Sequence, residues 1–178
     1  NAVLKDINFK VEAGEIVAYA PYLYGIVAVD GRKAVLAGVD FPAVRDTSPW
    51  WKVTGDWAGE GNGTTKGMVG ANVARQLGLS GGGELLLQYD SRNEKVKLTG
   101  IVETGGAEES QIFIPLARAQ TLLGKPDAVS AVQVSALSSK RPLAEVTKAI
   151  ELWVRGSQAK IIGQIADAEV SILAKVQL

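Results

Sequence analysis

The constraint that does most to limit the fold is a pair of apolar runs joined by an Asp-Gly turn. Residues 15–29 are rich in Ile, Val, Ala and Tyr, and residues 33–39 form a second apolar run. Between them, Asp30 and Gly31 tolerate the positive φ angles that a type I′ turn requires at both central positions. The pattern therefore predicts an antiparallel hairpin. Because proline donates no ladder hydrogen bond, Pro21 indicates that the first strand lies at an edge or carries a bulge.

Strands and helices alternate along the rest of the chain. Apolar runs with a period of two predict strands at residues 84–89, 95–103, 111–114, 129–136 and 159–162. Apolar residues at helical spacing predict helices at residues 69–77, 115–123, 142–156 and 164–178. Gly78 and Leu79, which follow the first of these helices, are typical of a Schellman cap with its hydrophobic contact. The alternation of hairpins with helices predicts an α+β fold.

Residues 46–67 interrupt this alternation. They are rich in Thr, Ser, Trp, Asn and Gly and have no sustained period, so we expect a long irregular connection with a functional role. Aromatic side chains gather in this connection and in the first strand, where they could anchor a partner protein or cover the core beneath the loop. The candidate partner contacts are Tyr22, Tyr24, Trp50, Trp51 and Trp57.

The chain contains no His and no Cys, which excludes Ser-His-Asp and Cys-His nucleophile systems, disulfides and ordinary zinc sites. The acidic groups in expected loops are Asp56 with Glu60, and Glu108 with Glu109. Nothing in their spacing indicates a general acid paired with a base, and we interpret them as solvated loop charges. We assign no catalytic residue, no metal ligand and no cofactor, and we expect a protein that is not an enzyme.

Charge and motif arguments also limit the partners. Lys and Arg number 19 and Asp and Glu also number 19, so no global field attracts nucleic acid. Residues 3–18 resemble the strands that lead into the P-loop of an ABC transporter ATPase, but residues 19–25 lack the G-x-x-x-x-G-K-[ST] motif that cradles phosphates. The glycines around Lys66 also lack that order, so we expect a mobile connector there. We expect the chain to be a piece of a longer protein, because it begins at Asn1 and its single Met is Met68.

Several segments, taken in order, resemble the extracytoplasmic domain of ABC transporter permeases of the MacB and FtsX type. These segments are residues 36–42, 68–79, 83–87, 96–102, 112–124 and 129–134. The resemblance covers roughly residues 15 to 155. It implies a two-lobed α+β module with a mixed sheet, helices and no active site of its own. A membrane-proximal, porter-like lobe would comprise residues 1–45 and 125–178, and residues 46–124 would form an inserted β-rich lobe.

The resemblance also implies a function. Such a domain couples ATP hydrolysis in the cytoplasm to engagement of a partner or substrate outside the membrane. The implied partners are a cytoplasmic ABC ATPase subunit reached through membrane helices, a periplasmic adaptor or client protein, and a second copy of the permease. The implied location is the periplasmic side of the bacterial cytoplasmic membrane, with an anchor of membrane helices outside these residues.

Two other classes of protein remain open as alternatives to a transporter domain. One is a soluble hydrolase or transferase that uses a carboxylate or Lys in residues 46–67, which a deep pocket lined by paired carboxylates would favour. The other is a free-standing secreted binding module, which a gene without membrane spans would favour.

Overall fold

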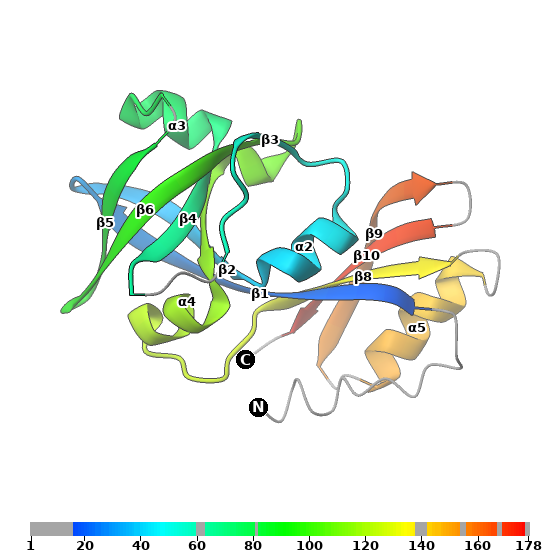
Figure 1. The fold of residues 1–178 in the computed structure, drawn as a ribbon. Coiled ribbons are helices and arrows are strands. Elements are labelled where there is room, and N and C mark those ends of the chain that lie inside the picture. Colours follow the sequence, from blue (N-terminus) through cyan, green and yellow to red (C-terminus); the bar gives the residue numbers. More distant parts are fainter. Residues whose placement is uncertain are drawn as a thin grey trace. The chain divides into compact units, whose positions relative to one another are not determined.

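The structure is a computed structural model that describes residues 16–59, 63–80, 82–137, 142–153, 156–166 and 169–176 (Figure 1). The chain divides into two compact units. The first unit comprises Asn1–Tyr22, Ala43–Pro49 and Ala128–Leu178, and the second comprises Leu23–Pro42 and Trp50–Asp127. Strand β1 (Ile16–Val29) and helix α2 (Phe41–Thr47) each contribute residues to both units.

The second unit is built on a closed ring of strands. The ring runs through the second half of β1, then β2 (Arg32–Val39), β7 (Gln111–Pro115), β4 (Thr65–Gly70), β6 (Arg92–Glu103) and β5 (Gly83–Tyr89), which pairs with β1 again. The β2–β7 and β4–β6 pairs are parallel, and the β4–β7, β5–β6 and β1–β5 pairs are antiparallel. Strand β3 (Lys52–Gly55) adds to β6 outside the ring. Because the ring closes, its strands leave no long open edge.

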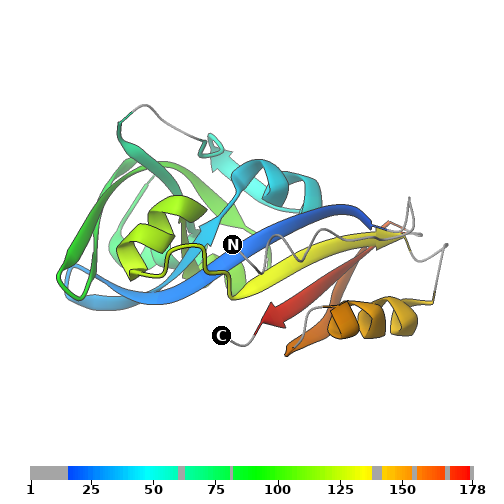
Figure 2. The same ribbon diagram turned by 90° about the horizontal axis from the view of Figure 1, so that it is seen from below.

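Short helices complete this barrel unit. Helix α4 (Leu116–Leu123) lies across one end of the barrel, as Figures 1 and 2 both show, and buries Ala119, Leu122 and Leu123. Gly38 of β2 allows this close approach, because a Cβ atom there would lie 2.3 Å from the Cβ atom of Ala119. Helix α3 (Ala71–Leu77) and the 3-10 helix η1 (Ala107–Ser110) lie close to each other, near β6.

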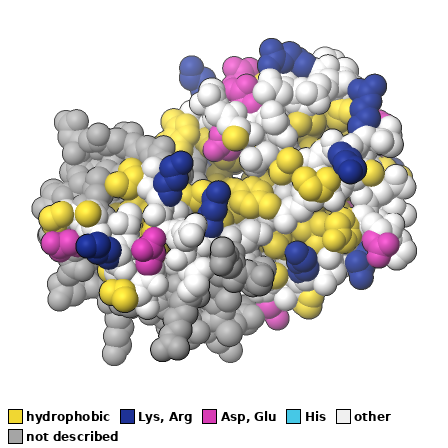
Figure 3. Space-filling view, turned by 180° about the vertical axis from the view of Figure 1, so that it is seen from behind, with side chains coloured by type: hydrophobic (Ala, Val, Ile, Leu, Met, Phe, Trp, Pro, Cys, Tyr) yellow, Lys and Arg dark blue, Asp and Glu magenta, His cyan; other side chains and the backbone are white. Residues whose placement is uncertain are grey.

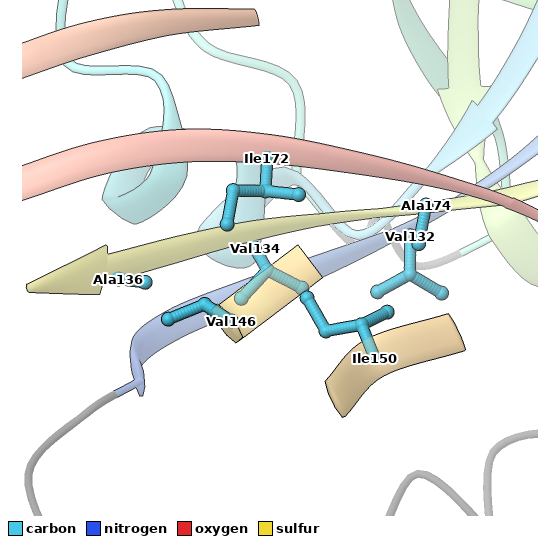
Figure 4. Packing of buried hydrophobic residues seen from close by; sticks show 7 residues of the cluster. All are labelled: Val132, Val134, Ala136, Val146, Ile150, Ile172 and Ala174. Atoms are coloured by element: carbon cyan, nitrogen blue, oxygen red, sulfur yellow. The ribbon is translucent and has the colours of Figure 1, made fainter. Parts of the chain in front are cut away.

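The first unit is an antiparallel sheet with a helix packed on one face. The first half of β1 pairs with β8 (Ala131–Leu137), which pairs with β10 (Glu169–Val176), which pairs with β9 (Ser157–Ala166). Helix α5 (Leu143–Trp153) places Val146 and Ile150 against the sheet (Figure 4). The buried cluster that they form includes Val132, Val134, Ala136, Ile172 and Ala174.

The hairpin prediction is confirmed. Asp30 and Gly31 have φ angles of 49° and 75°, as the type I′ turn between β1 and β2 requires. Pro21 lies in the part of β1 that pairs with β8, and β8 is the described strand next to it there. At such an edge of a sheet, a proline breaks no ladder hydrogen bond.

The cap prediction is confirmed as well. Gly78 adopts the left-handed conformation, and the backbone N–H of Leu79 donates to the carbonyl of Ala74 at 2.8 Å, which is the Schellman arrangement. Helix α3 begins at Ala71, however, because Val69 belongs to β4. The α+β class and the mixed sheet are confirmed.

The helix predicted at residues 164–178 is wrong. Residues 157–166 and 169–176 form β9 and β10 instead. In β10, Ile172 and Ala174 are buried whereas Lys175 is exposed, which is the two-residue alternation of a strand. Pairing with β8 on one side and β9 on the other fixes this strand, and that long-range contact outweighs the local apolar spacing.

The long irregular connection expected at residues 46–67 is wrong in part. Helix α2 extends into it to Thr47, whose hydroxyl donates to the Ala43 carbonyl at 3.0 Å. Strand β3 occupies residues 52–55, and β4 begins at Thr65, so that Lys66 lies on a strand and not on a connector. The segment 3–14 and Glu60, which the sequence analysis singled out, lie outside the described residues.

Candidate partner-binding site

The two tryptophans Trp51 and Trp57 form an aromatic cluster in the barrel unit. Their ring centroids lie 5.9 Å apart with the planes 15° from parallel. Trp51 also lies 4.9 Å from Phe113 of β7, at an interplanar angle of 58°. Trp51 is 7% exposed, so most of its surface is committed to this cluster and not to solvent. Trp51 immediately precedes β3, and the pairing of β3 with β6 fixes its position over the barrel core.

Trp50 has the opposite character. Its side chain is 39% exposed, although it is the chain neighbour of the buried Trp51. Trp57 is half-buried, on the outer side of the aromatic cluster. Exposed tryptophans are effective anchors for partners, because they bury a large area with few rotatable bonds. Of the three tryptophans, Trp50 therefore offers a partner the most surface.

Tyr22 takes part in a buried polar network within the first unit. Its side chain is 3% exposed, and its hydroxyl donates to Oε1 of Gln133 at 3.2 Å. Nε2 of Gln133 donates in turn to the Thr47 carbonyl and to Oγ of Ser48, both at 3.0 Å. Buried amides and hydroxyls are stable when they are hydrogen-bonded in this way. The network positions the C-terminal turn of α2 against β8 and leaves Tyr22 little surface for a partner.

Tyr24 lies two residues along β1 and belongs to the barrel unit. Its side chain is half-buried. Burial, with a smaller effect from the Glu108 carboxylate, raises the pKa of the Tyr24 phenol from 10.0 to about 12. The phenol is therefore neutral at physiological pH. The structure does not bring the five candidate contacts together as one set, because Tyr22 belongs to the other unit.

A shallow hollow of about 370 Å³ lies on the barrel unit beside α3. Side chains of both signs and several apolar ones line it: Ala71, Ala74, Arg75, Leu79, Ile101, Glu103 and Glu109. Glu109 lies beside α3 and β6 in this hollow, a placement that depends on the fold and not on its position in the sequence. None of the described residues of the segment 46–67 lines this hollow.

Glu109 is held in place by the loop that precedes η1. Its Oε1 atom accepts hydrogen bonds from the backbone N–H groups of Gly105 and Thr104 at 2.8 and 3.0 Å. These bonds, with a smaller effect from Arg75, lower the pKa of the Glu109 carboxyl below its usual value. A carboxylate that stays ionised in this way is a poor proton donor at neutral pH, so Glu109 is not suited to be the acid of a general acid and base pair.

The described residues were compared with what a metal site and a membrane-spanning helix require. Among the residues that the structure describes, no group of three His, Cys, Asp or Glu side chains could hold a metal ion. Within the same part of the chain, no helix combines the length and the apolar character needed to cross a bilayer. Hydrophobic and basic side chains are interspersed over the face drawn in Figure 3. Among the residues whose side chains are described, the exposed large hydrophobic ones are Tyr19, Ile26, Trp50, Leu86, Leu152 and Ile161.

Comparison with known proteins identifies the fold. No protein-family model matches this chain. No curated protein matches it by sequence. Among solved structures, the chain is similar to the periplasmic region of MacB from Actinobacillus actinomycetemcomitans, with a TM-score of 0.56 and 14% identity, over 85% of this chain and 74% of that one. The chain has the fold of the MacB periplasmic region.

A second structure with the MacB-type fold extends the likeness. The chain is similar to the extracellular domain of the noncanonic ABC-type transporter YknZ from Gram-positive bacteria, with a TM-score of 0.54 and 13% identity. This likeness covers 83% of this chain and 81% of the YknZ chain. Both proteins are parts of ABC-type transporters that lie outside the cytoplasm, and the resemblance noted in the sequence is confirmed at the level of the fold.

Proposed function

We propose that this chain is the extracytoplasmic domain of an export-type ABC transporter permease. In this role it couples ATP hydrolysis by a cytoplasmic subunit to the engagement of a partner or substrate outside the membrane. The observation that supports the proposal is the MacB-type fold, which extends over 85% of the chain and therefore includes residues of both units. Fold alone does not fix function, so the proposal also draws on the site.

The continuity of the chain between the units supports a mechanical role. β1 passes from the first unit to the second between Tyr22 and Leu23, within a hydrogen-bonded strand. α2 passes between the units at Pro42 and Ala43, within a helix. These two crossings lie within regular elements and not within loops, which supports the mechanical role that we propose.

The partners follow from this role. The domain would connect to a cytoplasmic ABC ATPase subunit through membrane helices that lie outside these residues, and a second copy of the permease would complete the transporter. Outside the membrane it would engage an adaptor or client protein by surface contact, with no cofactor. Exposed Trp50 is the aromatic side chain that we assign to such a contact, and the half-buried Tyr24 and Trp57 belong to the same unit.

Affinity purification of the intact gene product from detergent-solubilised membranes tests the proposal. We expect an ABC ATPase subunit to co-purify and the complex to hydrolyse ATP. A variant in which a Gly-Ser linker replaces residues 16–176 should keep the ATPase subunit, because that subunit binds elsewhere. The variant should nevertheless lose the export that the intact transporter performs, measured by mass spectrometry of the secreted material. An intact gene product with no associated ATPase contradicts the proposal, as does export that persists without the domain.

A further inference from the structure

Lysine side chains gather on the outer face of three adjacent barrel strands. β6 pairs with β4 on one side and with β5 on the other, so it is an interior strand over this stretch. Lys66 of β4 lies beside Lys97 of β6 in this register, and Lys95 lies two residues along β6 on the same face. The three lysines are exposed, whereas Val96 and Leu98 between and after them are buried in the barrel. The alternation of the strand therefore directs all three lysines outward.

The acidic groups nearby do not balance these lysines. Glu84 of β5 lies opposite Lys97 in the register, but its Oε2 atom forms a salt bridge at 2.8 Å with the Nζ atom of Lys95. Neither Lys66 nor Lys97 forms a salt bridge with any residue that the structure describes. Among the described residues, these two ammonium groups on neighbouring strands therefore have no carboxylate that forms a salt bridge with them.

The stability of the fold does not account for this arrangement. Like charges on directly neighbouring strand positions destabilise a sheet. Lysines are commonly used to protect exposed sheet edges from pairing with other chains. Lys97 has no edge to protect, because Lys66 of β4 and Glu84 of β5 are its neighbours on the two sides of β6. A ligand that supplies negative charge would relieve the repulsion between Lys66 and Lys97 when it binds.

An apolar side chain adjoins the lysines. Leu86 of β5 lies opposite Lys95 and is 47% exposed. A free phosphate or another small anion would leave Leu86 in water, whereas a polypeptide can present carboxylates to Lys66 and Lys97 and an apolar side chain to Leu86. This combination of charge and apolar surface favours a protein segment as the ligand.

We propose that the surface formed by Lys66, Lys95, Lys97 and Leu86, which we name the lysine face, binds an acidic segment of a partner protein. The carboxylates of that segment lie against Lys66 and Lys97, and an apolar side chain of the segment covers Leu86. The proposal rests on the barrel unit alone, and it holds whether or not the chain belongs to a transporter. Its failure is therefore distinguishable from failure of the proposed function.

Titration of the ¹⁵N-labelled chain with a synthetic peptide, followed by NMR, tests the lysine face. The peptide alternates Glu with Leu and Ser, and a matched peptide carries Gln in place of every Glu. We expect the Glu peptide to shift the amide signals of β4, β5 and β6, and the Gln peptide to shift none. Binding should weaken as salt is added, since it depends on charge. The double substitution Lys66→Gln and Lys97→Gln should weaken binding by about tenfold or more.

A matched control separates the lysine face from the general charge of the chain. The double substitution Lys33→Gln and Lys125→Gln removes the same charge from exposed positions elsewhere on the barrel unit, and it should leave binding unchanged. The spectrum without peptide shows whether each variant is folded. The proposal is overturned if the peptide shifts other strands, or if the Lys66 and Lys97 variant binds as well as the control. It is also overturned if phosphatidylglycerol vesicles bind the lysine face and the Glu peptide does not, because the ligand would then be a membrane surface.

Discussion

Burial in the barrel unit keeps the phenol of Tyr24 neutral up to high pH. Because the pKa is raised from 10.0 to about 12 in the folded chain, folding favours the protonated form. The stabilisation from this residue is therefore present in full below pH 10.0 and is lost as the pH rises through about 12. Tyr24 lies on β1, the strand that contributes residues to both units.

A spectrophotometric titration of the tyrosines checks this expectation. The absorbance change near pH 12 should be smaller in Tyr24→Phe than in the parent, by the contribution of one tyrosine. The variant should also lose less stability than the parent between pH 10.0 and about 12, as measured by denaturant unfolding. Tyr19→Phe, which removes a tyrosine that is 48% exposed, is the control and should leave the high-pH step in place. An absorbance change near pH 12 that is as large in Tyr24→Phe as in the parent would show that the burial of Tyr24 is described wrongly.

At the scale of elements, the contact between the β4–α3 junction and η1 depends on Gly70. A Cβ atom at this position would lie 2.2 Å from the carbonyl oxygen of Glu109 and 2.5 Å from that of Glu108. Both atoms belong to the backbone of η1, which cannot move away as a flexible side chain can. Gly70 thus sets the distance between η1 and α3, the elements that supply Glu109 and Arg75 to the hollow.

Gly70→Ala should therefore lower the free energy of unfolding by about 1–3 kcal/mol, since the new methyl group forces the backbone of η1 to shift. Gly59→Ala is the matched control. A Cβ atom there would meet nothing within 4 Å, and we expect a change of less than about 0.5 kcal/mol. Urea unfolding of the two variants measures the difference. Equal stability of the two variants would mean that η1 does not approach Gly70 as closely as described.

Local chemistry explains which elements could be predicted from the sequence. The turn at Asp30 and Gly31 and the cap at Gly78 depend on backbone angles that few residue types adopt. These residue types therefore predict the turn and the cap from the sequence alone. Strand β10 depends instead on pairing with β8 and β9. The spacing of its apolar residues is also compatible with a helix, so the sequence alone does not show that it is a strand. Helix α2 is not predicted, although Pro42 in its first turn is a helix-start signal. The helix is short, and the glycines and tryptophans that follow it are typical of an irregular connection.

The candidate site was less predictable than the fold. Aromatic composition drew attention to residues 50–57, but composition does not tell the buried Trp51 from the exposed Trp50. The lysine face had a partial signal, since Lys95 and Lys97 alternate with apolar residues in one predicted strand. Its significance depends on Lys66, which only the β4–β6 register places beside Lys97. The hollow beside α3 likewise assembles residues from three separate segments.

At the scale of the whole molecule, the account depends on the chain lying outside the cytoplasmic membrane as part of a transporter permease. Two of the solved structures to which the chain is similar are a periplasmic region and an extracellular domain. A location outside the membrane would give the lysine face and Trp50 access to partner proteins there. It would leave the energy source, ATP, on the other side of the membrane, reached only through the rest of the permease.

Cysteine labelling of the intact gene product in cells tests this location most directly. The chain has no natural Cys, so a single Lys125→Cys substitution at an exposed position gives a unique thiol within it, in a background freed of any other Cys. Val134→Cys, at a position that is 0% exposed, is the control and should stay unlabelled. We predict that a membrane-impermeant maleimide labels Lys125→Cys in intact spheroplasts. Labelling that occurs only after the membrane is disrupted would place the chain in the cytoplasm and contradict the account.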